Sequence, residues 1–299
     1  MEIRRLSLCR GFSLIEMIIA ISVLGILSAS TAVFLRGPIT SYFDTERRAN
    51  LANAGELAMA KMAQEISRAV PNSVRVTVVG SGFYLEFLPL ISGFNVVGEG
   101  FYNVPSPGPG PSFTAGTPKL SFDVICTPSP PISIPCPTGA PGNNWVVINN
   151  DVANTYLDLG PDTDVWVDPL GVSSRTRLTN IAGSIINHSA KVFVGPAPGS
   201  ASDYRFQIAA DPVTYFCDPL PVPGNGTLTR YSGYGAPSAV QPQPSLSLLN
   251  VLATQITACN AQVLRGDLKR AQVVALTLTF TNAGDSLNLY QTIRVEPLP

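Results

Sequence analysis

A long apolar run near the amino terminus constrains this chain more than any other feature. From Phe12 to Leu35 the sequence runs for 24 residues with one charged side chain, Glu16. A helix of this length spans about 36 Å, enough to cross a hydrocarbon core of roughly 30 Å. The run therefore predicts a transmembrane helix at 12–36. Because a carboxylate at mid-membrane costs about 2.5–3.5 kcal/mol on insertion scales, we expect Glu16 to have a partner and a function.

The residues around the start of the run form a compact motif. Gly11-Phe12-Ser13-Leu14-Ile15-Glu16 follows a short basic leader at 1–11, and it resembles the processing site of type IV prepilins and pseudopilins. The resemblance implies that a membrane peptidase cleaves between Gly11 and Phe12 and methylates the new amino terminus at Phe12. It also implies an assembly role for Glu16. Pairing of its carboxylate with the new ammonium group would offset its desolvation, within a subunit or between neighbours.

Two other interpretations of the amino terminus stay open. A basic start before an apolar run also describes a cleaved signal peptide, and Ser28-Ala29-Ser30 is an acceptable cleavage site. A plain membrane anchor fits the length equally well. The acidic residue inside the apolar region argues against a signal peptide. Arginines flank the run on both sides, so the positive-inside bias is weak. The processing motif and the downstream cysteines place the amino terminus in the cytoplasm.

Helical periodicity continues beyond the membrane segment. Gly37-Pro38 predicts a kink or break, since proline removes a backbone donor and disfavours helix in the residue before it. Residues 37–71 then form the amphipathic half of the N-terminal helix, which we expect to end at Pro71-Asn72. Its apolar face is expected to pack on a sheet. That face consists of Leu51, Ala54, Ala58, Met62, Ile66 and Val70.

Residues 72–299 predict a β-rich head. Short segments of β-branched and aromatic residues alternate with Gly/Pro-rich loops. They predict strands at 73–79, 82–91, 119–125, 145–149, 156–159, 189–194, 202–209, 213–217 and 227–231. Leucines at helical spacing predict a short helix at 245–258. The clearest hairpin joins 275–281 to 286–295 through Asn282-Ala283-Gly284-Asp285. The expected fold class is α+β and pilin-like, with a long N-terminal helix packed on an antiparallel β-rich periplasmic head.

Four cysteines lie beyond the membrane segment: Cys126, Cys136, Cys217 and Cys259. An even number in this position indicates disulfides and an oxidising compartment. Three pairings are possible, and proximity in the sequence favours Cys126 with Cys136 and Cys217 with Cys259. A zinc site is the weaker alternative, because the chain has no CxxC and its one histidine, His188, is remote from the cysteines.

Four aspartates gather around Trp166: Asp158, Asp162, Asp164 and Asp168. Carboxylate oxygens are ligands that calcium prefers. The spacing is not that of an EF-hand, and acidic residues are common in turns, so a solvated turn is favoured over a calcium site. His188 lies in a polar stretch and is expected at the surface. We find no motif of a known catalytic class, and we expect neither enzymatic activity nor a cofactor.

Two later segments add a narrower resemblance. Residues 212–217 read Pro-Val-Thr-Tyr-Phe-Cys, and residues 230–234 read Arg-Tyr-Ser-Gly-Tyr. Together with the amino terminus they resemble the "O" family of large minor prepilins encoded with mannose-sensitive haemagglutinin (MSHA) pilus systems. The resemblance implies a minor pilin whose partners are the prepilin peptidase/methyltransferase, other major and minor pilins, and the inner membrane. A net charge of −1 argues against a nucleic-acid partner.

The size of the head points to a place in the filament. It exceeds what a compact pilin body needs, and a tip or initiation subunit can carry extra bulk because it need not tile along the shaft. A J-like minor pseudopilin of a type II secretion system is the alternative within the class. A tip adhesin and a secreted enzyme with a cleaved signal are the alternatives outside it.

Overall fold

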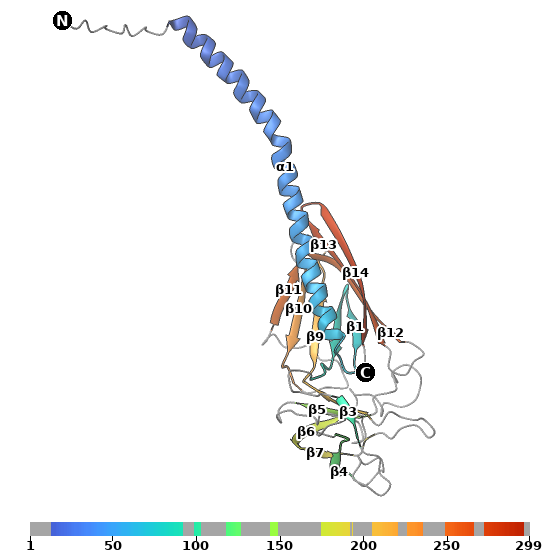
Figure 1. Ribbon diagram of the computed structural model, residues 1–299. Helices are drawn as coiled ribbons and strands as arrows, with labels where there is room; N and C mark the ends of the chain where they lie inside the picture. Colours follow the sequence, from blue (N-terminus) through green and yellow to red (C-terminus); the bar gives the residue numbers. More distant parts are fainter. Residues whose placement is uncertain are drawn as a thin grey trace, which may run out of the picture. The chain divides into compact units, whose positions relative to one another are not determined.

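The computed structural model describes residues 13–91, 99–102, 118–126, 144–148, 175–191, 193, 205–220, 226–235, 249–265 and 272–295. The chain divides into two compact units, Met1–Asn50 and Leu51–Pro299. The described residues form one long helix and three antiparallel sheets (Figure 1). This confirms the predicted α+β, pilin-like fold class.

Helix α1 runs without interruption from Leu14 to Ile66 and includes Pro38. The prediction at Gly37-Pro38 was a kink or break, and the break is therefore wrong. A proline inside a helix removes one backbone donor and crowds the carbonyl group four residues earlier, and both effects are local to that turn. The hydroxyl of Thr40 donates to the carbonyl oxygens of Arg36 and Gly37 at 3.0 and 2.9 Å, which helps to hold the turn that contains the proline.

A five-stranded sheet has the order β1-β2-β9-β10-β11, and all its pairs are antiparallel. Its strands are β1 Arg75–Val79, β2 Gly82–Phe87, β9 Val213–Asp218, β10 Thr227–Ser232 and β11 Leu249–Thr254. The helix predicted at 245–258 is wrong over its described part, since β11 pairs along β10 there. Leucines three or four residues apart occur in helices and also in strands, and here the pairing with a neighbouring strand decides between the two.

A second sheet has the order β12-β13-β14, with β12 Ile256–Arg265, β13 Gln272–Asn282 and β14 Asp285–Val295. The predicted hairpin is confirmed, with Asn282 paired to Asp285. Ala283 and Gly284 both have positive φ (48° and 91°), as a tight hairpin turn requires. Between β11 and β12 the chain passes from one sheet to the other at Gln255, which also has a positive φ of 66°.

The carboxy-terminal part of α1 and these two sheets enclose one apolar core. On α1 the buried residues are Leu51, Gly55, Ala58, Met59, Met62 and Ile66. The predicted apolar face was therefore largely right, but Ala54 is exposed and Gly55 takes its place. A Cβ atom at Gly55 would lie 2.5 Å from Cδ1 of Leu289 and 3.0 Å from Cε2 of Phe280. Glycine thus lets the helix approach β13 and β14 closely.

The third sheet is an insertion. β2 pairs directly with β9, so the five-stranded sheet contains none of the strands that lie between them in the sequence. Those strands form a sheet of their own. The added strands are β3 Glu99–Phe101, β4 Lys119–Asp123, β5 Trp145–Ile148, β6 Arg175–Ala182, β7 Ile185–Lys191 and β8 Arg205–Ala209, in the order β3-β8-β5-β6-β7-β4. Strands β3 and β6 were not predicted, and β7 begins four residues before the strand expected at 189–194.

The two edges of this inserted sheet meet. Tyr102, directly after β3, forms an antiparallel bridge with Val124, directly after β4. The sheet thereby closes on itself, and we call it the inserted barrel. It encloses an apolar cluster of its own, including Tyr102, Phe122, Val146 and Phe206. A smaller cluster, in which Val70 and Leu88 meet Trp145 and Ala209, lies where the barrel joins the end of the α1 region.

Candidate functional site

The start of α1 is capped by Ser13. Its Oγ accepts a hydrogen bond from the backbone N–H of Glu16 at 3.3 Å, and its carbonyl oxygen accepts from the N–H groups of Glu16 and Met17 at 3.1 and 3.2 Å. Ser-x-x-Glu is the sequence pattern of a capping box, and the helix dipole favours a carboxylate in the first turn. Glu16 is thus held at the helix start. Gly11 and Phe12 lie outside the described residues, so their roles stay predictions.

The first part of α1 is an apolar surface, and three of its hydroxyl groups are hydrogen-bonded within the helix. Every large apolar side chain from Leu14 to Leu35 is exposed within the chain. The hydroxyls of Ser22, Ser30 and Thr31 each donate to the carbonyl oxygen four residues earlier, at 2.8 Å. A bilayer offers no water to such groups, so internal pairing suits a membrane environment. By length and composition α1 can cross a membrane.

Farther along, a carboxylate of α1 is hydrogen-bonded to the five-stranded sheet. Oε2 of Glu65 accepts hydrogen bonds from the hydroxyl of Tyr215 at 2.7 Å and from Nε of Arg230 at 2.8 Å. Its other oxygen lies 2.7 Å from Nζ of Lys61, one helical turn earlier. Tyr215 and Arg230 are paired neighbours on β9 and β10, so the two donors lie side by side.

The protonation of Glu65 follows from these contacts. Burial by itself would raise the pKa of its carboxyl group, but the hydrogen bonds from Arg230, Lys61 and Tyr215 outweigh burial and lower the pKa. Burial and the adjacent carboxylate raise the pKa of Tyr215, which keeps its hydroxyl protonated as a donor. The cluster is therefore a charge-assisted attachment between helix and sheet.

A second carboxylate serves the opposite face of the same sheet. Glu86 on β2 is fully buried and accepts from Nε of Arg75 at 2.7 Å and from the hydroxyl of Tyr234 at 2.6 Å. Since Tyr234 donates its one proton to Glu86, the hydroxyl of Thr214 donates to the Tyr234 oxygen at 2.6 Å. Burial raises the pKa of Glu86, and Arg75 and Tyr234 offset this in part.

These contacts give the two later sequence segments a structural role. Tyr215 and Thr214 come from the segment 212–217, and Arg230 and Tyr234 come from the segment 230–234. Sequence reasoning picked out both segments but missed the two glutamates that they serve. For Glu86, the signal was an acidic residue inside the apolar run of β2.

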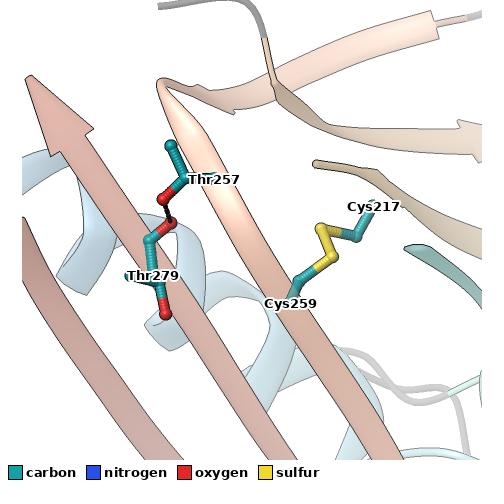
Figure 2. The surroundings of a disulfide bond; sticks show 4 residues. All are labelled: Cys217, Thr257, Cys259 and Thr279. Carbon is teal, nitrogen blue, oxygen red and sulfur yellow. Dashed lines mark hydrogen bonds between the residues drawn. A yellow bond between two sulfur atoms is a disulfide. The ribbon is translucent and has the colours of Figure 1, made fainter. Parts of the chain in front are cut away.

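A disulfide joins the two sheets that flank the core. Cys217 on β9 and Cys259 on β12 are bonded, with Cα atoms 6.6 Å apart (Figure 2). This is the pairing that proximity favoured. Near it the hydroxyl of Thr257 lies 2.9 Å from that of Thr281, across the pairing of β12 with β13. Cys126 is also disulfide-bonded; Cys136, its expected partner, lies outside the described residues.

The remaining candidate residues from the sequence are His188 and the four aspartates around Trp166. His188 is 1% exposed, so the expectation of a surface histidine is wrong. It lies inside the inserted barrel, because its polar neighbours in sequence alternate to the other face of β7. Asp158, Asp162, Asp164 and Asp168, with the strand expected at 156–159, lie outside the described residues. Within the described ranges, no cluster of three or more histidine, cysteine or acidic residues is placed to hold a metal ion.

Comparison with protein families gives one match. Residues 6–32 match the family model described as the prokaryotic N-terminal methylation motif. The match covers the junction and the first part of α1, and it supports the class of type IV prepilins and pseudopilins. It implies processing by a prepilin peptidase and pilin-type assembly. No curated protein and no solved structure matches the chain.

Replacing Glu65 by Gln tests the attachment of α1 to the sheet. We expect the free energy of unfolding to fall by about 1.5–3 kcal/mol, since a neutral amide loses the charge-assisted bonds from Arg230 and Tyr215. The lowered pKa adds a pH signature: the stabilisation by Glu65 is present above pH 4.5, its unfolded pKa, and is lost as the pH falls through the folded pKa.

The measurement is chemical denaturation of the full chain in detergent micelles between pH 3 and 7. Glu56→Gln, at an exposed position of the same helix, is the matched control. Equal stability of the two variants at pH 7 would contradict the role of Glu65.

Proposed function

We propose that this chain is a minor pilin or pseudopilin. A prepilin peptidase cleaves it between Gly11 and Phe12 and methylates Phe12, α1 anchors it in the inner membrane, and it is then incorporated into a filament. Its amino terminus faces the cytoplasm and its head the periplasm. The observation that carries the proposal is the methylation motif placed on a capped helix whose apolar surface is uncovered within the chain.

The mechanism is assembly rather than catalysis. Lipid tails are as apolar as the α1 surface, so hydrophobicity alone gives the subunit no reason to leave the membrane. Packing against other pilin helices supplies part of the drive. Pairing of Glu16 with the ammonium group created at Phe12 supplies the rest, since a carboxylate paired in this way no longer bears its full desolvation cost.

The narrower proposal is an MSHA-like type IV pilus, with this subunit at the tip or at initiation. Two observations support it. The segments that resemble the MSHA "O" family supply the partners of Glu65 and Glu86, so they are structural parts of the head. The inserted barrel adds a second folded body to a sheet that is complete without it, and such bulk suits a subunit that is not stacked within the shaft.

A J-like role in a type II secretion system is the alternative, because the amino-terminal motif fits both filaments. Co-purification from membranes separates them. Minor pilins captured with this chain support the pilus, and secretion-system pseudopilins support the alternative. Glycan binding by the chain would favour a tip adhesin.

Mass spectrometry of the mature amino terminus tests the class directly. We expect a chain that begins at an N-methylated Phe12. A chain that begins near Thr31 would instead show cleavage of a signal peptide after Ser28-Ala29-Ser30. That result would contradict the proposal. A chain that keeps residues 1–11 would leave only a plain anchor. Gly11→Lys in the same strain is the control, and it should retain the leader.

Replacing Glu16 by Val tests the assembly role separately from processing. We expect cleavage to stay largely intact, because the scissile bond is unchanged. Incorporation into filaments should fall severely, because the ammonium group at Phe12 loses its partner. Immunoblots of membrane and sheared-filament fractions measure both steps. Glu46→Val, outside the apolar run, is the control, and normal filament incorporation of Glu16→Val would count against the pairing.

A further inference from the structure

His188 is buried inside the inserted barrel. It sits on β7 directly opposite Leu178 of β6 and is 1% exposed. Its ring packs against the rings of Phe122 and Phe193, with centroids 5.6 and 5.4 Å away. An ionisable side chain is thus enclosed by aromatic and aliphatic groups.

The hydrogen bonds of the ring fix which nitrogen carries the proton. Nδ1 lies 2.8 Å from the carbonyl oxygen of Ser189, which can only accept, so Nδ1–H is the donor. The same carbonyl also accepts from the hydroxyl of Thr176 at 3.0 Å. Nε2 is buried and has no hydrogen-bond partner among the described residues. A second proton would therefore create a buried cation whose new N–H has no acceptor there.

The charged side chains of the neighbouring strands do not relieve this. They are Lys119 and Asp123 on β4, Arg175 and Arg177 on β6, and Lys191 on β7 itself. Asp123, Arg175 and Arg177 occupy positions that alternate with Phe122 or Leu178, which places them on the other face of the sheet. Lys119 and Lys191 lie beyond an irregularity in the pairing of β4 with β7, and as cations they cannot stabilise a second positive charge on His188. Only Asp123 among them is acidic. Burial accordingly lowers the pKa of His188, and the hydrogen bond to Ser189 opposes that shift only in part.

We propose that the inserted barrel is a pH-sensitive module, closed while His188 is neutral and opened when acid protonates it. The pairings of β7 with β4 and β6 are the ones that loosen, because His188 packs among them. The core between α1 and the other two sheets is a separate apolar cluster and keeps its structure. This inference does not depend on pilus assembly; it assigns acid-triggered opening to one part of the head.

Proton linkage gives the direction in which the stability of the barrel changes with pH. A histidine whose folded pKa is lowered leaves stability intact above its unfolded value of about 6.5, and stability is lost as the pH falls from there towards the folded pKa. For one proton, the equilibrium constant for barrel opening rises by up to about tenfold per pH unit in that window.

The test uses the full chain in detergent micelles. Because His188 is the only histidine, its imidazole gives one set of ring-proton NMR signals, which can be followed from pH 8 to 4.5. Amide hydrogen exchange, corrected for the intrinsic effect of pH, is measured at the same points in β4, β6 and β7. We expect the barrel amides to lose protection up to about tenfold per pH unit below about 6.5, while β13 stays protected.

Two outcomes would overturn the proposal. One is an imidazole that titrates at its ordinary value with no change in barrel exchange. The other is a His188→Leu variant that keeps the wild-type pH dependence, since that variant should stay closed in acid. If His188→Leu does not fold, the titration of the unmodified chain still decides.

Discussion

The apolar surface of α1 from Leu14 to Leu35 has to be covered by something outside this chain. Its side chains are exposed in the folded structure, and a continuous apolar surface of this length is not stable in water. The chain supplies a cap at Ser13 and internal partners for the hydroxyls of Ser22 and Ser30. What is missing is a bilayer or other apolar helices, and the methylation motif is consistent with membrane anchoring.

The carboxy-terminal end of α1, unlike the first part, is packed on the rest of the chain and has to stay fixed to the head. Burial of one face supplies most of the attachment, but apolar packing alone does not fix the rotation of a helix on a sheet. Glu65 does so through two donors on adjacent strands, and Gly55 sets the distance to β13 and β14. The disulfide between Cys217 and Cys259 then joins the two sheets that the helix touches.

Features carried by local periodicity could be predicted from the sequence, and features carried by distant partners could not. The strict alternation of 276–281 predicted β13, and the spacing of Leu51, Ala58 and Met62 predicted the buried face of α1. The helix expected at 245–258 failed because β10 recruits that segment as an edge strand.

The same limit applies to single polar residues. His188 is polar among polar neighbours, and only the closure of the barrel shows that it is buried. From the sequence, Glu65 is expected to be a solvated helix residue. Its partners Tyr215 and Arg230 lie 150 and 165 residues away in the sequence, on β9 and β10. Charge and local pattern cannot anticipate a partner at that separation.

We expect the two parts of α1 to have different surroundings, although side chains on both are exposed within the chain. Val23 is 48% exposed and Leu57 is 72% exposed, so either could react as a cysteine if the chain were free in water. Labelling Val23→Cys and Leu57→Cys with a membrane-impermeant maleimide in intact inner membranes tests the claim directly. We expect Leu57→Cys to be labelled and Val23→Cys to be labelled only after detergent is added. Equal labelling of the two in intact membranes would contradict it.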